Sequence, residues 1–202
     1  MQYERNRQKS EWNPILQIRD FYGSTLCIVG LGDIGREVAV RGKAFEARVI
    51  AVKRTAGECP PYIDKLYGTD EIDLALPQAD YLVMALPNTP ETKGILSAER
   101  IARLKPGAFV VNVGRGAAIC QDALIRALQE GKLAGAGLDV TDPEPLPADS
   151  PLWKMPNVII TSHTSGSSPG NWERFAELIR KNLILYTEGK PLVNRVDYKL
   201  KY

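Results

Sequence analysis

Six short apolar segments alternate with longer segments of helical pattern along this 202-residue chain. The apolar segments are rich in Val, Ile, Leu and Ala and lack strict alternation with polar residues, which is typical of strands buried on both faces of a sheet. The strand patterns cover residues 25–29, 48–52, 81–86, 108–113, 135–140 and 158–161, and the helical patterns cover residues 34–47, 97–104 and 121–130. This alternation predicts an α/β fold with a doubly wound parallel sheet.

Three regions depart from the alternation. Residues 142–156 contain five prolines and predict a rigid, irregular loop. Residues 169–186 predict one long amphipathic helix, and the apolar residues on one of its faces are Phe175, Leu178, Ile179, Leu183 and Tyr186. The first twelve residues are highly charged and predict the end of a helix or a linker.

The net charge and the cysteines of the chain bear on which partners and which cellular compartment it has. The 26 basic and 24 acidic residues give a net charge of +2, which creates no strong field for nucleic acid or a membrane surface. Cys27, Cys59 and Cys120 form no CxxC pair, so neither a metal site nor a disulfide framework is indicated. The N-terminus lacks an apolar signal core, and no apolar run is long enough for a bilayer. We expect a cytoplasmic protein without a metal, nucleic-acid or membrane partner.

A glycine-rich turn connects the first strand pattern to the first helical pattern. Its sequence, GLGDIG, matches G-x-G-x-x-G in the context that gives this motif meaning. Gly30 permits a tight turn, Gly32 lets a pyrophosphate approach the backbone, and Gly35 lets helix and strand pack closely. The backbone N–H groups of Asp33 and Ile34 begin the helix, whose N-terminus attracts phosphate. The turn predicts a Rossmann-type dinucleotide-binding domain; the alternative is a glycine-rich turn without a ligand.

The residues after the second strand pattern bear on the choice of cofactor. A site for NAD usually places an acidic residue there to hold the ribose 2′-hydroxyl. This chain has Lys53, Arg54 and Thr55, a basic pair with a neighbouring hydroxyl that would attract a 2′-phosphate. The sequence therefore predicts a preference for NADP(H), with NAD(H) as the second choice. The alternative is a solvated basic loop.

Three later segments, residues 111–116, 137–145 and 161–166, follow the ends of strand patterns, where ligands bind in an open α/β sheet. Arg115 can bind a substrate carboxylate and polarise the adjoining carbonyl. His163, the single histidine of the chain, can deliver a proton to the carbonyl oxygen as hydride reaches the carbon. Glu144 can orient the imidazole and raise its pKa. These residue types suit hydride transfer to a 2-keto acid; the alternative is a surface Arg, a loop Glu and a capping His.

Several longer segments carry a resemblance to a known family. They are GLGDIG, ADYLVMALPNTPET, LKPGAFVVNVGRGA, ALQEGKLAGAGLDV, DPEPLP and TSHTSG, spread over residues 26–194. Together they resemble the D-isomer-specific 2-hydroxyacid dehydrogenase family. The resemblance implies that Arg115, Glu144 and His163 are the catalytic set, that Asp139 lies near the nicotinamide carboxamide, and that the protein is a homodimer. The predicted cofactor-lining residues beyond those named above are Leu86, Pro87, Thr92, Val113, Gly114, Arg115, Asp139, His163, Ser165 and Gly166.

The chain also departs from the family pattern. Family members are usually longer, with a substrate domain divided around the cofactor domain, so we expect a fragment or a shortened form. Residues 1–16 are then the remnant of an interdomain helix or linker, residues 17–168 the dinucleotide-binding domain, and residues 169–202 the segment that returns to the substrate domain. Asp33 stands where many relatives have Arg, and Arg36 could compensate; Glu46 stands at a helix end where the family tends to have Gly.

Two classes of function follow. The first is an NADP(H)-dependent oxidoreductase acting on a small 2-keto or 2-hydroxy acid such as glyoxylate, hydroxypyruvate or pyruvate. The second is a catalytically weak dinucleotide-binding module or sensor, as in corepressors of the C-terminal-binding type. Retention of Arg115, Glu144 and His163 favours the enzyme, whereas truncation favours the module. Oxidation of formate or phosphite is a third alternative, which the predicted pairing of Glu144 with His163 disfavours.

Overall fold

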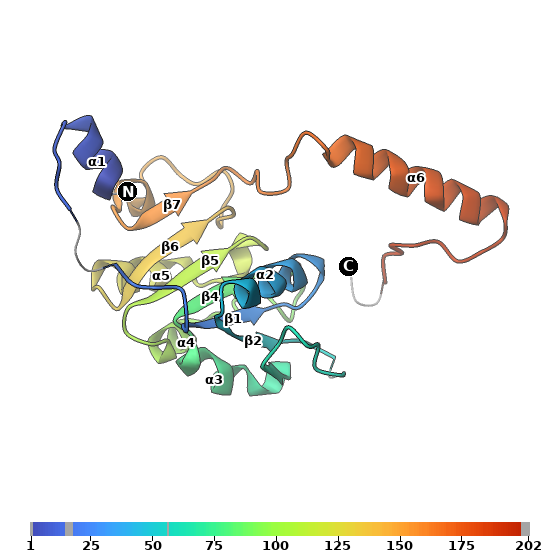
Figure 1. The fold of residues 1–202 in the computed structure, drawn as a ribbon, viewed down its shortest axis with the longest axis horizontal. Coiled ribbons are helices and arrows are strands. Elements are labelled where there is room, and N and C mark those ends of the chain that lie inside the picture. The colour runs from blue at the N-terminus through green and yellow to red at the C-terminus, as the bar shows by residue number, and fades with distance from the viewer. Residues whose placement is uncertain (1, 15–17, 56, 199–202) are drawn as a thin grey trace.

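A seven-stranded parallel sheet forms the centre of the computed structural model, which describes residues 2–14, 18–55 and 57–198. The strand order is β3-β2-β1-β4-β5-β6-β7, and all neighbouring strands are parallel (Figure 1). The strands are β1 Thr25–Val29, β2 Arg48–Val52, β3 Lys65–Tyr67, β4 Tyr81–Met84, β5 Ala108–Asn112, β6 Leu133–Leu138 and β7 Val158–Ile160. The chain winds outward from β1 in both directions, so the doubly wound α/β prediction is confirmed.

Helices cover both faces of this sheet. The α-helices of the described residues are α1 Gln2–Gln8, α2 Asp33–Ala44, α3 Ile72–Ala75, α4 Ala98–Arg103, α5 Gln121–Gln129 and α6 Asn171–Thr187, of which α2 to α5 pack on the sheet. α2 packs on β1 and β2 from one face, and α3, α4 and α5 cover the other face (Figure 1). Of the helices among the described residues, none has the length and apolar character needed to cross a bilayer.

β1 shows why the strand patterns lack polar alternation. Leu26 and Ile28 pack with Ala39 of α2 in one core cluster. Cys27 and Val29 point to the opposite face and belong to the larger cluster beneath α3, α4 and α5. Both sets of side chains are buried, so a polar residue on either face would lack water or a partner.

β3 and α3 are missing from the sequence prediction. β3 has three residues and lies at the edge of the sheet, where Lys65 is exposed and Tyr67 alone is buried. A segment this short, with one buried side chain, has no period that could distinguish a strand from a loop. α3 is a single turn of helix, Ile72–Ala75, and four residues are too few to show a helical period.

The predicted helix over residues 34–47 is three residues too long at its C-terminal end. α2 ends at Ala44, and Glu46 takes a left-handed conformation with φ 58°. The N–H of Ala47 donates to the carbonyl of Gly42 at 3.1 Å, which closes the helix end in the manner usually served by glycine. The structure therefore places a non-glycine residue at a position that favours glycine.

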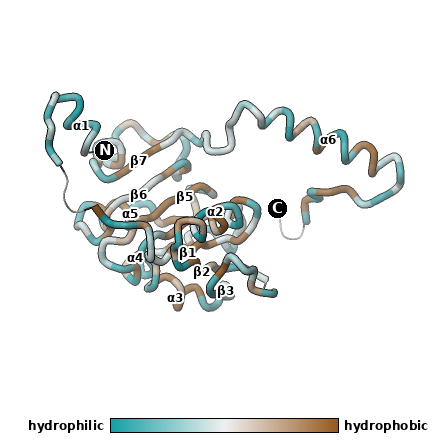
Figure 2. The backbone as a smooth tube through the Cα atoms, in the orientation of Figure 1, coloured by the Kyte–Doolittle hydropathy of each residue, from teal (hydrophilic) through white to brown (hydrophobic). Residues whose placement is uncertain are grey.

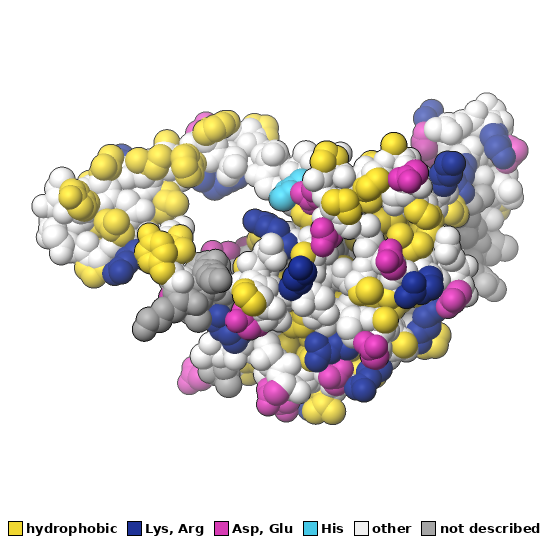
Figure 3. Space-filling view, turned by 180° about the vertical axis from the view of Figure 1, so that it is seen from behind, with side chains coloured by type: hydrophobic (Ala, Val, Ile, Leu, Met, Phe, Trp, Pro, Cys, Tyr) yellow, Lys and Arg dark blue, Asp and Glu magenta, His cyan; other side chains and the backbone are white. Residues whose placement is uncertain are grey.

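The amphipathic helix predicted at residues 169–186 is confirmed as α6, but its apolar face is exposed. None of its 17 residues is buried. Phe175, Ile179 and Leu183 all lie open on this arm, which extends away from the sheet (Figure 1). Figure 2 shows hydrophobic positions along α6, and Figure 3 shows hydrophobic side chains gathered on the same arm. The pattern thus predicted the helix without indicating what lies against it.

Candidate active site and dinucleotide cleft

The glycine turn directly follows β1 and is shaped by close backbone contacts. Gly30 has φ 102°, and a Cβ placed on it would lie 2.5 Å from the carbonyl oxygen of Ala85. A Cβ on Gly35 would overlap the carbonyl oxygen of Gly30. At Gly32, by contrast, a Cβ would meet nothing within 4 Å. Two glycines are therefore required by packing, while the third faces open space into which a ligand can approach the backbone.

The N-terminus of α2 is open to an anion. α2 begins at Asp33, and its N-cap residue, Gly32, has no side chain that could accept a hydrogen bond from the first turn. The N–H of Arg36 donates to the carbonyl of Gly32 at 2.9 Å, which is the first hydrogen bond within the helix. The backbone N–H groups that come before Arg36 in the first turn have no carbonyl partner within the helix. Asp33 and Ile34 are exposed at this end. The partial positive charge of the helix end and these N–H groups suit phosphate.

A cleft of about 600 Å³ extends from the glycine turn past the end of β2 to the loop after β4, within the size range of ligand sites. The predicted residues that line it are Gly30, Gly32, Lys53, Arg54, Thr55, Leu86, Pro87 and Thr92. The backbone of the glycine turn at one end of the cleft suits a pyrophosphate, and the basic pair at the other end suits a further phosphate group. The residues present therefore fit this cofactor.

Other lining residues escaped the sequence analysis: Thr69, Thr89, Glu91, Ile95 and Arg100. Thr69 follows β3, the strand that the pattern did not reveal. Thr92 was predicted to line the cofactor, and its hydroxyl also shapes the loop. That hydroxyl donates to the carbonyl of Pro87 at 2.6 Å and accepts from the N–H of Thr89 at 2.9 Å.

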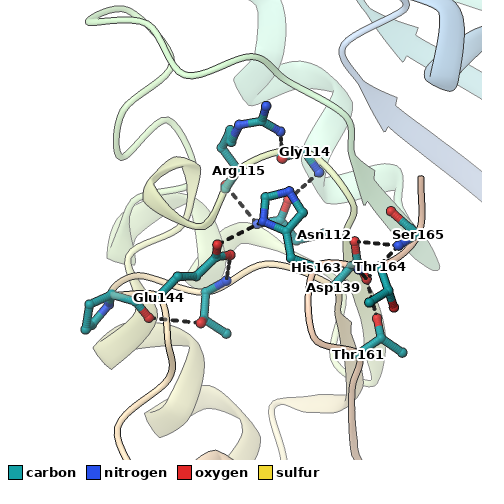
Figure 4. A network of polar contacts seen from close by, with 11 residues as sticks. Asn112, Gly114, Arg115, Asp139, Glu144, Thr161, His163, Thr164 and Ser165 are labelled. Carbon is teal, nitrogen blue, oxygen red and sulfur yellow. Dashed lines mark hydrogen bonds and ion pairs between the residues drawn. The ribbon is translucent and has the colours of Figure 1, made fainter. Parts of the chain in front are cut away.

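The imidazole of His163 lies against the carboxylate of Glu144, with 2.9 Å between Nδ1 and Oε2 (Figure 4). The hydrogen bond with His163 lowers the pKa of Glu144, and the N–H of Thr141 and the charge of Arg115 add to this against the effect of burial. An ionised carboxylate can only accept a hydrogen bond, so Nδ1 carries a proton. Nε2 is then the ring nitrogen that can exchange a proton with a ligand.

Arg115 reaches the same edge through a short turn after β5. The buried amide of Asn112 donates to the carbonyl of Arg115 at 3.0 Å and accepts from the N–H of Gly114 at 3.1 Å. A Cβ on Gly114 would lie 2.6 Å from the backbone of Leu86, so this turn packs against the wall of the cleft. Figure 4 shows the imidazole of His163 between Glu144 and the Gly114–Arg115 segment. Asn112 was not singled out from the sequence, because a polar residue ending a strand has no distinctive spacing.

The Arg115 guanidinium folds back, and Nη1 donates to the carbonyl of Gly114 at 2.7 Å. Its charge nevertheless acts on Glu144, as the lowered pKa of that carboxyl indicates. The neighbouring Val113 donates its N–H to the carbonyl of Met84 at 3.0 Å and packs on the core. The structure therefore brings the predicted catalytic residues to one edge of the sheet, beside the glycine turn.

Asp139 follows β6 and holds the loop that carries His163. Its buried carboxylate accepts from the hydroxyl of Thr161 at 2.5 Å and from the N–H groups of Thr164 and Ser165 at 3.0 and 3.2 Å. Burial alone would raise the pKa of Asp139, but hydrogen bonds from Ser165, Thr161 and Thr164 outweigh it and lower the pKa to about 2. His163 itself has φ 53°, a left-handed conformation that is uncommon for residues other than glycine. Gly166, just beyond, has no neighbour within 4 Å of a Cβ placed on it.

A second hollow, of about 390 Å³, adjoins the imidazole. Asp139, Glu144 and His163 line it together with apolar residues from the proline-rich loop and β7. These apolar residues include Leu146, Trp153 and Ile160, none of which stood out in the sequence. Trp153 is fixed by a hydrogen bond of 2.9 Å from Nε1 to the carbonyl of Pro147. The predicted catalytic residues Glu144 and His163 thus line a partly apolar hollow that shares no lining residue with the cleft at the glycine turn.

The family model for the NAD-binding domain of D-isomer specific 2-hydroxyacid dehydrogenases matches residues 1–165. The chain belongs to this family. The 2-hydroxyacid dehydrogenase resemblance predicted from the sequence is therefore confirmed, and the cleft beside the glycine turn is that of a nicotinamide-dinucleotide-binding domain.

Individual 2-hydroxyacid dehydrogenases are similar over most of this chain. A glyoxylate reductase from Korarchaeum cryptofilum is 37% identical over 195 residues, which are 95% of this chain and 58% of that protein. A D-isomer specific 2-hydroxyacid dehydrogenase from Xanthobacter autotrophicus, solved with NADPH, gives a TM-score of 0.89 at 33% identity, covering 100% of this chain and 81% of that one. An NADPH-dependent glyoxylate/hydroxypyruvate reductase from Sinorhizobium meliloti, solved with NADP and sulfate, gives a TM-score of 0.89 at 30% identity. The match covers 100% of this chain and 63% of that one. The chain spans less than three fifths of the curated glyoxylate reductase.

Proposed function

We propose that this chain carries the cofactor site and the acid–base residues of an NADP(H)-dependent reductase that acts on small 2-keto acids. The observation that carries the proposal is the 2.9 Å contact between Nδ1 of His163 and Glu144, at the same edge as Arg115 and the glycine turn. A sensor that only binds a dinucleotide has no use for an imidazole whose second nitrogen is left available.

The proposed cofactor roles follow from the two ends of the cleft. The backbone of residues 30–35 would hold the pyrophosphate, and Lys53, Arg54 and Thr55 the 2′-phosphate. When bound, NADPH supplies the hydride that is added to the carbonyl carbon of the substrate. The NADP(H) complexes of the two solved relatives support the preference for the phosphorylated cofactor. Leu86, Pro87 and Thr92 would line the cofactor between its ends.

The proposed chemistry of the chain lies in three side chains. Nε2 of His163 gives a proton to the carbonyl oxygen in reduction and takes it back in oxidation. Glu144 keeps the ring oriented, and the lowered pKa of its own carboxyl keeps it ionised. Arg115 binds the substrate carboxylate, for which its guanidinium would have to leave the carbonyl of Gly114. Asp139 and Ser165 border the nicotinamide end of the site.

The substrate class is proposed from the relatives. Their names point to glyoxylate and hydroxypyruvate, and pyruvate is the third 2-keto acid to be tested. We also propose that the protein is a cytoplasmic homodimer. The family resemblance implies the dimer, which a sedimentation measurement would test.

The deciding experiment follows the absorbance of reduced nicotinamide after the chain is mixed with NADPH or NADH and each of the three acids. We expect oxidation of NADPH with glyoxylate or hydroxypyruvate, and a lower Kd for NADPH than for NADH. Binding of NADPH without turnover of any acid would favour a dinucleotide-binding module, or a cofactor domain that turns over substrate only together with a complete substrate domain. A lower Kd for NADH would overturn the assignment of the basic pair.

A further inference from the structure

The glycine turn carries one charged side chain, and its charge is negative. Asp33 is the first residue of α2 and directly follows Gly32, which lines the dinucleotide cleft. The Asp33 side chain is 96% exposed, and among the described residues it forms an ion pair with Nη2 of Arg36, 3.2 Å from Oδ1. The proposed acid–base chemistry does not use this carboxylate.

We propose that Asp33 opposes the pyrophosphate of the cofactor and thereby sets the affinity of this chain for any nicotinamide dinucleotide, with Arg36 as a partial counter-charge. The inference rests on dinucleotide binding in the cleft at the glycine turn. It does not rest on the preference for NADP(H), because both cofactors contain the same pyrophosphate.

The Asp33 carboxylate and the pyrophosphate compete for the positive N-terminal end of α2. A helix N-terminus stabilises negative charge in its first turn, whether the charge belongs to a side chain or to a ligand. Asp33 already supplies such a charge at the start of α2. A pyrophosphate that uses the N–H groups of this turn must therefore come close to a carboxylate of the same sign.

Arg36 does not cancel this effect. Its side chain is 52% exposed, and the pair is held by one contact of 3.2 Å between residues one turn apart. Exposed pairs of this kind are weak and screened by water. When a pyrophosphate is present, the same guanidinium is attracted to both anions and cannot neutralise them together.

The size of the effect follows from charge and distance. One negative charge close to a doubly charged pyrophosphate, in water-like surroundings, weakens binding by about three- to tenfold at low ionic strength. The penalty shrinks as salt is added, because the interaction is exposed to solvent. The change Asp33→Asn should remove it without changing the size of the side chain.

The test measures direct binding to the full chain by calorimetry, without any turnover. Four probes are titrated: NADPH, NADH, adenosine 2′,5′-bisphosphate and adenosine 2′-monophosphate. We expect Asp33→Asn to tighten the first three by a similar factor, since each places a phosphate at the glycine turn. Adenosine 2′-monophosphate has no such phosphate, so its Kd should stay unchanged.

Glu37→Gln is the matched control. Glu37 is an exposed acid one turn further along α2, and it is paired with Arg41 at 2.6 Å. The change alters net charge by the same amount as Asp33→Asn, and it should leave all four Kd values unchanged.

Several outcomes would overturn the inference. Unchanged Kd values in Asp33→Asn, equal tightening of adenosine 2′-monophosphate, or equal tightening in Glu37→Gln would each do so. If both dinucleotides bind and Asp33→Asn has no effect, this inference fails alone. If the wild type binds none of the probes, the proposed function fails with it.

Discussion

The carbonyl oxygen of Asp139 accepts a hydrogen bond of 2.8 Å from the backbone N–H of His163. The carboxylate of the same residue accepts from the next two N–H groups, those of Thr164 and Ser165. One buried aspartate therefore fixes three consecutive residues, the first of which has φ 53°. The orientation of the imidazole toward Glu144 depends on this loop as much as on the contact between the two side chains.

The change Asp139→Asn should lower stability in a pH-dependent way. The Asp139 pKa is lowered from the ordinary value to about 2, so its stabilising effect is present above about pH 4 and is lost as the pH falls through 2. The shift corresponds to about 2 kcal/mol of unfolding free energy at neutral pH. Denaturant unfolding of wild type and variant at several pH values would measure this difference.

The control for this measurement is Asp149→Asn. Asp149 is exposed, so its loss should leave the unfolding free energy nearly unchanged at every pH. A stability difference for Asp139→Asn that stays constant from neutral pH to pH 2 would contradict the assigned role of the charge.

His163→Gln should reduce kcat by about 100- to 10,000-fold, because general acid–base catalysis by a positioned side chain is of that size. Glu144→Gln should reduce it less, since the amide oxygen can still accept from Nδ1 but no longer stabilises the charged ring. The Kd for NADPH should stay within about twofold in both variants, as neither residue lines the cleft at the glycine turn. Turnover that survives in His163→Gln would show that another group transfers the proton.

Arg54→Gln should weaken NADPH binding by about 10- to 100-fold, which is the usual loss for a charge-assisted hydrogen bond. NADH lacks the 2′-phosphate and serves as the internal reference, with an unchanged Kd. Lys65→Gln is the matched control, because Lys65 lies on the adjacent β3 with Nζ over the ring of Tyr67, outside the lining of the cleft. Equal losses for NADPH in the two variants would indicate a general effect of charge.

Glu46→Gly should stabilise the chain by about 1 kcal/mol, because it relieves the left-handed conformation after α2. Glu46→Ala removes the same carboxylate but keeps a Cβ, and should give no such gain. Thermal unfolding of both variants separates the backbone effect from the charge effect. A similar rise in Tm for Ala and Gly would assign the change to the carboxylate.

Much of the sheet could be predicted from its apolar segments. β1 and β2 match their predicted bounds, because strands buried on both faces require continuous apolar residues. β3 could not be predicted, since its three residues bury one side chain at the sheet edge. Thr69, which follows it and lines the cleft, was missed for the same reason.

The candidate site shows the same division. Arg115, Glu144 and His163 could be found because each follows a strand and has a distinctive chemistry. Asn112 and Trp153 act on the site through a backbone carbonyl and an apolar wall, and such roles depend on coordinates rather than on spacing. The hydrogen bonds that Asp139 accepts from its loop likewise join residues 22–26 positions apart, which no local pattern reveals.

The exposure of α6 has a consequence for hydrogen exchange. With no buried side chain, its 17 residues gain little from tertiary contacts, and an isolated helix of this length is marginal in water. Amide hydrogens of α6 should therefore exchange through local opening that costs little free energy. Those of β1, which is buried throughout, should exchange only on global unfolding. The chain then contains a slow-exchanging unit that ends near His163 and a fast-exchanging one that follows it.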